Sequence, residues 1–188
     1  MRSGRPTLLP AGSRGPAAGV AVLAAAVVGV LAVRYAGNNG PGRVDGHLDR
    51  AVDALPGHGI ARMVIDLGSP LFVTVSAAVL ALVCLSGRRY RMAALAVAGP
   101  GLTGLVTTFG KPAVDRTIGH GGELAFPSGH TGGATSLALV AALLLAATLR
   151  LGSGATAVLA GLCAVAAGAA VGTGMVVTGQ HYPTDVIG

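Results

Sequence analysis

The run Pro-Ser-Gly-His-Thr at residues 127–131 has the composition of an anion-binding helix start. Ser128 suits the N-cap position of the apolar stretch that follows, and Gly129 lets an anion approach the backbone closely. Unpaired N–H groups at a helix start, with the helix dipole behind them, attract phosphate. His130 adds a group that exchanges a proton near neutral pH. On its own, however, the run fits a plain helix cap equally well.

A second polar run, GQHYPTDVIG, occupies residues 179–188. Pro183 and Asp185 both suit the first turn of a helix. His181 and Asp185 are four residues apart, so one helical turn would bring the carboxylate to the imidazole. A carboxylate that accepts a hydrogen bond from one ring nitrogen fixes the tautomer and leaves the other nitrogen free to attack. The pattern is typical of a histidine nucleophile.

Together, the two histidines suggest phosphoryl transfer with divided roles. One imidazole attacks phosphorus, and the other, when protonated, gives its proton to the departing oxygen. Lys111 supplies a point charge and Arg116 a planar fork of donors, both suited to phosphate oxygens. These cations and the helix-start amides stabilise the charge on the equatorial oxygens. The scheme requires no metal ion and no cofactor, and we expect neither.

The segments that position these groups are apolar. Of the 188 residues, 52% are hydrophobic and 11% are charged, whereas a soluble domain has about 25% charged residues. A spanning helix needs about 20 mostly apolar residues, and five stretches fit. We therefore predict an all-α, polytopic transmembrane helix bundle with spans at residues 17–33, 67–87, 92–110, 129–149 and 155–177.

We divide the chain into a basic cytoplasmic tail over residues 1–16 and one transmembrane phosphatase-like domain over residues 17–188. The first span follows three arginines and resembles the apolar core of a signal peptide. Because its core is long for that role, we prefer an uncleaved helix. Between the first two spans, in residues 34–66, apolar residues recur at helical spacing. That pattern predicts a short amphipathic helix on the membrane surface.

The number of crossings places the polar residues together. Two spans separate the loop after residue 110 from the segment after residue 177, so both lie on the same side of the membrane in either orientation. This places Lys111, Arg116, His120, Ser128 and His130 on the same side as His181 and Asp185. The basic cluster at residues 88–91 occupies a short loop on the other side, and the positive-inside rule favours that side as cytoplasmic. We expect a multi-pass protein of the cell membrane whose site faces the extracytoplasmic side.

The net charge of +6 does not indicate a nucleic-acid partner. The basic residues lie in short loops between apolar runs, as in membrane proteins. Basic residues interleaved with aromatic ones, which bind RNA or DNA, are absent from the sequence. The expected partners are membrane lipids and a lipid phosphate substrate, and a homo-oligomer is an open alternative.

In their order and membrane placement, these motifs resemble those of the type 2 phosphatidic acid phosphatases, a family related to the vanadium haloperoxidases. Residues 127–131 match the second motif of that family, and residues 179–188 match the His and Asp half of its third. Lys111 followed by Arg116 resembles part of the first motif. The resemblance covers roughly residues 65–188. It implies a six-helix bundle that hydrolyses lipid phosphomonoesters or diphosphates, such as phosphatidate or polyprenyl diphosphate, at an extracytoplasmic site without a metal cofactor.

The resemblance also implies roles for individual residues. His181 would be the nucleophile that forms a phosphohistidine, Asp185 would orient it, and His130 would be the general acid. The residues implied to hold the substrate phosphate are Lys111, Ser128 and Gly129, with Arg116 as a further contributor.

Two arginines of the family pattern are replaced here. Ile118 stands seven residues after the motif lysine, and Met175 stands six residues before the nucleophilic histidine. In oxyanion sites, the loss of one positioned hydrogen-bond donor lowers the reaction rate by roughly 10²–10³-fold. The sequence is therefore compatible with a slow enzyme, with a site completed by Arg116 or His120, or with a protein that binds phosphorylated lipids without turnover. A small transporter or channel component is a further alternative, suggested by the intramembrane His130.

The family pattern also includes a sixth helix, whereas this sequence stops three residues after Asp185. Three expectations stay open at this point. The chain is truncated, or the last helix is dispensable, or another chain supplies it.

Overall fold

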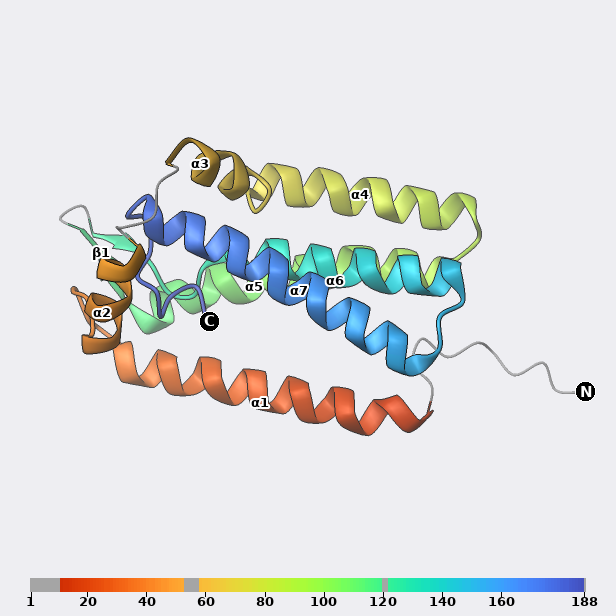
Figure 1. Cartoon of the computed structure of the whole chain (residues 1–188), viewed down its shortest axis with the longest axis horizontal. Helices are drawn as coiled ribbons and strands as arrows, with labels where there is room; N and C mark the ends of the chain where they lie inside the picture. The colour runs from red at the N-terminus through yellow and green to blue at the C-terminus, as the bar shows by residue number, and fades with distance from the viewer. Residues whose placement is uncertain (1–10, 53–57, 120–121, 188) are drawn as a thin grey trace, which may run out of the picture.

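The computed structural model describes residues 11–52, 58–119 and 122–187. Five long helices dominate it (Figure 1). They are α1 (Ala11–Tyr35), α4 (Pro70–Ser86), α5 (Tyr90–Val114), α6 (Gly129–Leu149) and α7 (Ser153–Val177). Two short helices, α2 (Arg43–Val52) and α3 (His58–Asp66), lie at one end of the bundle, beside the antiparallel pair β1 (Thr117–Ile118) and β2 (Glu123–Leu124).

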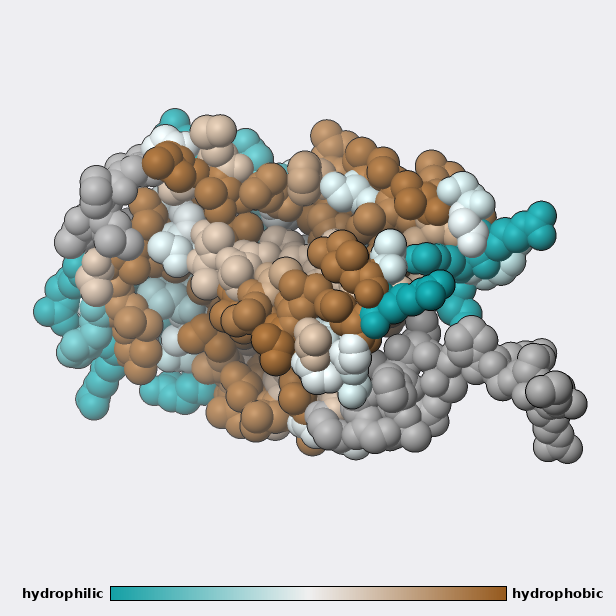
Figure 2. Space-filling view, turned by 45° about the vertical axis from the view of Figure 1, so that its right-hand side comes forward, coloured by the Kyte–Doolittle hydropathy of each residue, from teal (hydrophilic) through white to brown (hydrophobic). Residues whose placement is uncertain are grey.

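The predicted all-α membrane bundle is confirmed. In the described residues, α5, α6, α7 and residues 17–35 of α1 are each long and apolar enough to cross a membrane. The remaining expected span, residues 67–87, corresponds to α4, which is long and apolar enough to cross a membrane together with α3; the two helices are bent by 45° at a short break. The outer surface agrees with a membrane setting, because apolar side chains cover the middle of the molecule and hydrophilic ones gather at its two ends (Figure 2).

The break between α3 and α4 follows from the sequence Gly-Ser-Pro at residues 68–70. Proline at a helix start is favoured but cannot continue a preceding helix, so α4 begins at Pro70. The Ser69 hydroxyl caps this start by accepting a hydrogen bond from the backbone N–H of Phe72 at 3.3 Å. The expected span at 67–87 is therefore a straight helix only from residue 70 onward.

Helix α6 is the centre of the bundle, since it packs against α4, α5 and α7. One buried cluster joins α4, α5 and α6 far from α2, and it includes Cys84, Ala96 and Val140. A second cluster joins α3, α6 and α7 near the end that carries the hairpin, and it includes Ile65 and Met175. Both clusters consist mainly of small or medium side chains, which allow close helix packing where lipid gives no hydrophobic driving force.

Helix α1 is held mainly at its C-terminal end. Tyr35 is its buried aromatic residue, and the Gly37 N–H donates to the Val114 carbonyl oxygen at 2.9 Å. The predicted amphipathic helix between the first two spans forms as α2. Its apolar Val44 and Leu48 face outward, and the residue that it buries is Asp45.

Gly68 allows the closest backbone approach that positions α6. A Cβ atom at this residue would lie 2.5 Å from the carbonyl oxygen of His130, in the first turn of α6. Real Cβ atoms do not approach a backbone atom that closely, so any side chain at residue 68 must push the two segments apart. Gly68 thus determines how near the α3–α4 break lies to His130.

We expect Gly68→Ala to lower the free energy of unfolding by about 1–3 kcal/mol, the usual cost of overpacking. The measurement is thermal unfolding of the purified protein in detergent. Gly101→Ala is the matched control, because the space around a Cβ there is open, and it should be neutral or slightly stabilising. Equal stability of the two variants would contradict the close approach.

Candidate functional site

A cavity of about 190 Å³ lies at the end of the bundle where α5 ends, α6 begins and α7 ends. Three of the residues singled out from the sequence line it: Lys111, His130 and His181. The crossing argument predicted that they would share one side, and the structure places them around one opening. The remaining lining residues are Ile118, Glu123, Leu124, Met175 and Gln180.

The start of α6 is a capped helix N-terminus, as the sequence predicted. The Ser128 hydroxyl accepts a hydrogen bond from the backbone N–H of Thr131 at 3.4 Å. It also lies 3.1 Å from the Thr131 hydroxyl. Ser128 is fully buried, whereas Gly129 and His130 are partly exposed. The cap therefore holds the first turn in place, and His130 faces the cavity from that turn.

The chain reverses direction after α7, at Gly179, which has a φ of +68°. This left-handed conformation suits glycine and returns the following residues towards the bundle. Residues 183–187 form turns, where the sequence suggested the start of a further helix. The turn still brings His181 and Asp185 together, with Nδ1 of the imidazole 3.7 Å from Oδ2 of the carboxylate.

That 3.7 Å separation is longer than a hydrogen bond. Oδ2 of Asp185 instead accepts from the backbone N–H of Tyr182 at 2.9 Å. Nδ1 of His181 is buried and has no hydrogen-bond partner among the described residues. Nδ1 faces the carboxylate that was expected to orient the ring, and a shift of under 1 Å would complete the bond. Catalytic hydrogen bonds are often this long before substrate binds.

Arg116 does not line the cavity. Its guanidinium is fully buried between two carboxylates, with Nη2 2.7 Å from Oδ2 of Asp45 and Nη1 bonded to Oδ1 of Asp185. Nη1 also donates to the Thr184 hydroxyl at 2.7 Å. The fork that the sequence analysis assigned to substrate phosphate is thus directed at two acidic side chains. Arg116 is joined to the candidate nucleophile through Asp185.

Two aromatic rings enclose the same guanidinium. Its central carbon lies 4.0 Å from the ring centre of Tyr35, at the end of α1, and 4.9 Å from that of Tyr182. Cation–π contacts of this kind strengthen when the cation is removed from water. Arg116 therefore connects α1, α2 and the segment after α7.

Asp45 was not identified by sequence reasoning. Oδ1 of this carboxylate accepts the Thr184 N–H at 2.9 Å, and Oδ2 accepts the Gly42 N–H at 2.8 Å. Burial alone would raise the pKa of Asp45, but these backbone bonds, the Thr184 hydroxyl and Arg116 together hold the pKa below its ordinary value. Its position in the first turn of α2 is the one local signal for this residue, and that signal indicates a helix start rather than a partner 71 residues away.

The cavity has few cationic groups for a phosphate site. Lys111, in the last turn of α5, donates from Nζ to the Leu124 carbonyl oxygen at 2.9 Å, so β2 fixes the position of its ammonium group. Glu123 adds a carboxylate to the lining. Ile118 and Met175, the two residues that replace pattern arginines, both line the cavity. The substitutions noted in the sequence thus change the lining of this cavity directly.

Of the other predicted site residues, Ser128, Gly129 and Asp185 lie immediately behind the cavity. The backbone N–H of Ser128 donates to the Asp185 carbonyl oxygen at 3.2 Å, which joins the two motifs. His120 lies outside the described residues. Glu123 and Gln180 are cavity residues that sequence reasoning missed, because each is an ordinary polar residue in a loop or short strand.

Comparison with known proteins gives one match. Residues 104–188 match the PAP2 superfamily. The matched segment begins within α5 and includes every lining residue of the cavity as well as Arg116 and Asp185. No curated protein and no solved structure matches the chain significantly.

We expect Asp45→Asn to destabilise the fold by about 3 kcal/mol or more at neutral pH, because it leaves a buried guanidinium with one carboxylate fewer. The folded-state pKa of Asp45 lies below 3.8, so the contribution of the ionised carboxylate is complete above that pH and is lost as the pH falls through the folded pKa. The difference in thermal stability from the unsubstituted chain should therefore shrink below about pH 4. Asp115→Asn, at an exposed residue, is the control. Equal effects of both substitutions, or a difference that does not change with pH, would contradict the buried pair.

Proposed function

We propose that this chain, whose residues 104–188 match the PAP2 superfamily, is a membrane phosphatase that hydrolyses lipid phosphates through a phosphohistidine. The observation that carries the proposal is the small cavity shared by His130, His181 and Lys111. These residues come from three different segments of the chain. Their arrangement supplies a nucleophile, a proton donor and a cation within one opening.

The proposed first step is attack on phosphorus by Nε2 of His181. The Nδ1–H group of His181 donates a hydrogen bond to Asp185, which keeps the ring in the tautomer with a free Nε2. A P–N bond forms while the bond from phosphorus to the lipid oxygen breaks. His130 gives its proton to that oxygen, and the lipid alcohol leaves. Lys111 and the N–H groups of the first turn of α6 stabilise the charge on the phosphoryl oxygens.

In the second step, water attacks the phosphohistidine. His130, now neutral, accepts a proton from that water, and the P–N bond breaks to release inorganic phosphate and free His181. Each imidazole returns to its starting protonation state. Asp185 stays in place throughout, because its carboxylate accepts hydrogen bonds from Arg116 and the Tyr182 N–H.

The dimensions and placement of the cavity support a lipid substrate. A volume of about 190 Å³ is below the range of about 300–1,000 Å³ typical of sites that enclose a whole small molecule. It is suited to a phosphate headgroup whose chains remain in the membrane. The cavity lies at the ends of the apolar helices, where lipid headgroups lie. Phosphatidate and polyprenyl diphosphate are the substrates that we propose.

We propose that the cavity faces the extracytoplasmic side of the cell membrane. The cluster Arg88, Arg89 and Arg91 lies at the opposite end of the bundle, in the short connection between α4 and α5 and the first turn of α5. The positive-inside rule assigns such a connection to the cytoplasm.

One observation favours a second candidate function, which is binding of phosphorylated lipids without turnover. Ile118 and Met175 line the cavity without charge, and the Glu123 carboxylate offsets the charge of Lys111. With both imidazoles neutral, the side chains that line the cavity carry no net charge. A site of this kind binds a phosphate but gives little stabilisation to the charge that moves onto the leaving oxygen in the transition state.

We expect His181→Ala to lose phosphate release from phosphatidate by about 10³-fold or more, measured on purified protein with a chelator present. His130→Gln should lose about 10²-fold or more on the same lipid. On an aryl phosphate whose leaving group needs no proton, the loss in His130→Gln should be much smaller. His47→Gln, at an exposed histidine of α2, should match the unsubstituted chain. Full activity of His181→Ala would refute the nucleophile, and equal losses of His130→Gln on both substrates would refute the general acid.

We expect Ile118→Arg to raise kcat/KM for lipid phosphate by about tenfold or more, because a guanidinium at this residue adds a donor at the cavity wall. Ile118→Leu is the control for packing and should leave the rate unchanged. If the unsubstituted chain binds lipid phosphate but releases none, and Ile118→Arg releases phosphate, the binding function is correct. A folded Ile118→Arg variant with no gain in rate would contradict this account of the cavity.

A further inference from the structure

The end of the bundle opposite the candidate active site is purely basic along α4 to α7. Arg88 and Arg89 lie in the connection from α4 to α5, Arg91 lies in the first turn of α5, and Arg150 lies in the connection from α6 to α7. The sequence has no Asp or Glu at residues 67–114 or 124–184. Such an end attracts anionic headgroups of the membrane surface.

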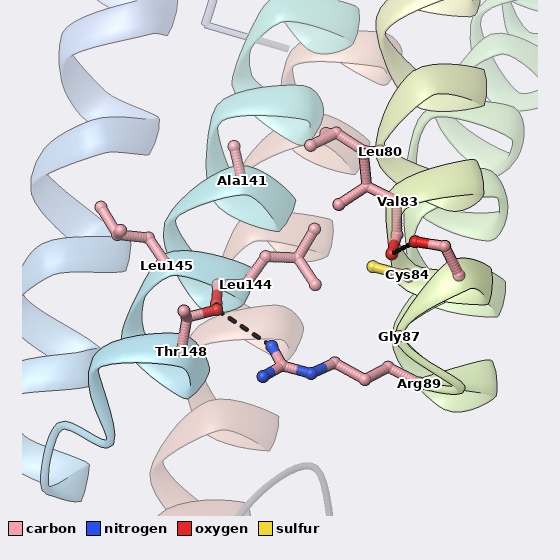
Figure 3. Close-up of a pocket in the computed structure, with 10 residues that line it drawn as sticks. Leu80, Val83, Cys84, Gly87, Arg89, Ala141, Leu144, Leu145 and Thr148 are labelled. Atoms are coloured by element: carbon pink, nitrogen blue, oxygen red, sulfur yellow. Dashed lines mark hydrogen bonds between the residues drawn. The ribbon is translucent and has the colours of Figure 1, made fainter.

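A second and larger cavity, of about 580 Å³, lies at this end between α4 and α6. Its walls are mostly apolar. Leu80 and Val83 of α4 face Leu144 of α6 across it, and Ala141 leaves space between them (Figure 3). Cys84 and Leu144 belong to the buried cluster behind the cavity, so its inner wall is well packed. The cavity is thus an apolar groove within the membrane-spanning part of the molecule.

Arg89 closes the basic end of this groove. Its side chain extends from the α4–α5 connection towards the end of α6, where Nη1 donates to the Thr148 hydroxyl at 2.9 Å (Figure 3). That hydroxyl in turn donates to the Leu144 carbonyl oxygen at 2.8 Å. A guanidinium has five N–H donors, and the bond to Thr148 uses one of them. The same group therefore lines an apolar groove and offers a fork of donors suited to phosphate.

We infer that this groove binds an anionic phospholipid of the membrane. One acyl chain lies between α4 and α6, and the phosphate of the headgroup pairs with Arg89, with the neighbouring arginines contributing attraction. Charge complementarity selects this occupant. An anionic phospholipid has an apolar chain that matches the walls of the groove and an anionic head that matches Arg89 at its basic end. Helix α6 is 21 residues long, so the site lies about 30 Å from the catalytic cavity and does not depend on the proposed function.

The test is native mass spectrometry of the purified protein in detergent, with an anionic and a zwitterionic phospholipid of identical acyl chains. We expect the anionic lipid to be retained preferentially. Arg89→Gln should reduce its retention about tenfold, the value of a charged hydrogen bond. Ala141→Phe should reduce it comparably by filling the groove. Arg62→Gln removes an exposed arginine at the other end of the bundle and should have no effect.

Thr148→Val separates lipid binding from fold stability. It removes the Thr148 hydroxyl while keeping the charge of Arg89, so the lipid should stay bound. Loss of the lipid in Thr148→Val to the same extent as in Arg89→Gln would overturn the proposal. Equal retention of the two lipids, or unchanged retention in both groove variants, would also overturn it. A dimer of the unsubstituted chain that is lost in those variants would overturn it as well, because a second copy of the chain would then occupy the groove.

Discussion

A single buried guanidinium connects the segments that carry the candidate chemistry. Arg116 follows α5, and its terminal nitrogens bond to Asp45 of α2 and to Asp185 of the segment after α7. Tyr35, at the end of α1, lies against its face. Because breaking a buried charge pair leaves an uncompensated ion, which costs about 3–5 kcal/mol, these segments are strongly constrained to remain together. The position of His181 depends on that constraint through Asp185.

This arrangement gives Asp185 a different electrostatic setting from a carboxylate that serves a histidine alone. One of its oxygens is held by Arg116, and the other accepts a backbone N–H and faces the imidazole. The carboxylate is thus held in place by groups other than His181. In the proposed cycle it orients the ring through Nδ1, while Nε2 is available to phosphorus.

Hydropathy and crossing number predicted much of the fold and the meeting of His130 with His181. Spans follow from the length of apolar stretches, which is a local property. The side of the membrane on which a loop lies follows from the number of spans before it, which needs no knowledge of side-chain contacts. The pairing of Arg116 with Asp45 could not be predicted in this way. Asp45 lies 71 residues away in the sequence, and its one local signal, a position in the first turn of α2, indicates a helix start rather than a distant partner. The position of Glu123 in the cavity likewise depends on a two-residue strand pairing, with Ile118 opposite Glu123, that leaves almost no sequence signal.

The most direct test of the account is whether the imidazole positions 130 and 181 share one cavity. Cysteines are placed at both positions in a chain whose Cys84 and Cys163 are replaced by alanine, and a short, membrane-impermeant bifunctional thiol reagent is added to sealed vesicles. The account predicts that both thiols react from the same side of the bilayer and that an intramolecular crosslink between them is found by mass spectrometry. Reaction of the two thiols from opposite sides, or two singly modified thiols without a crosslink, would contradict it.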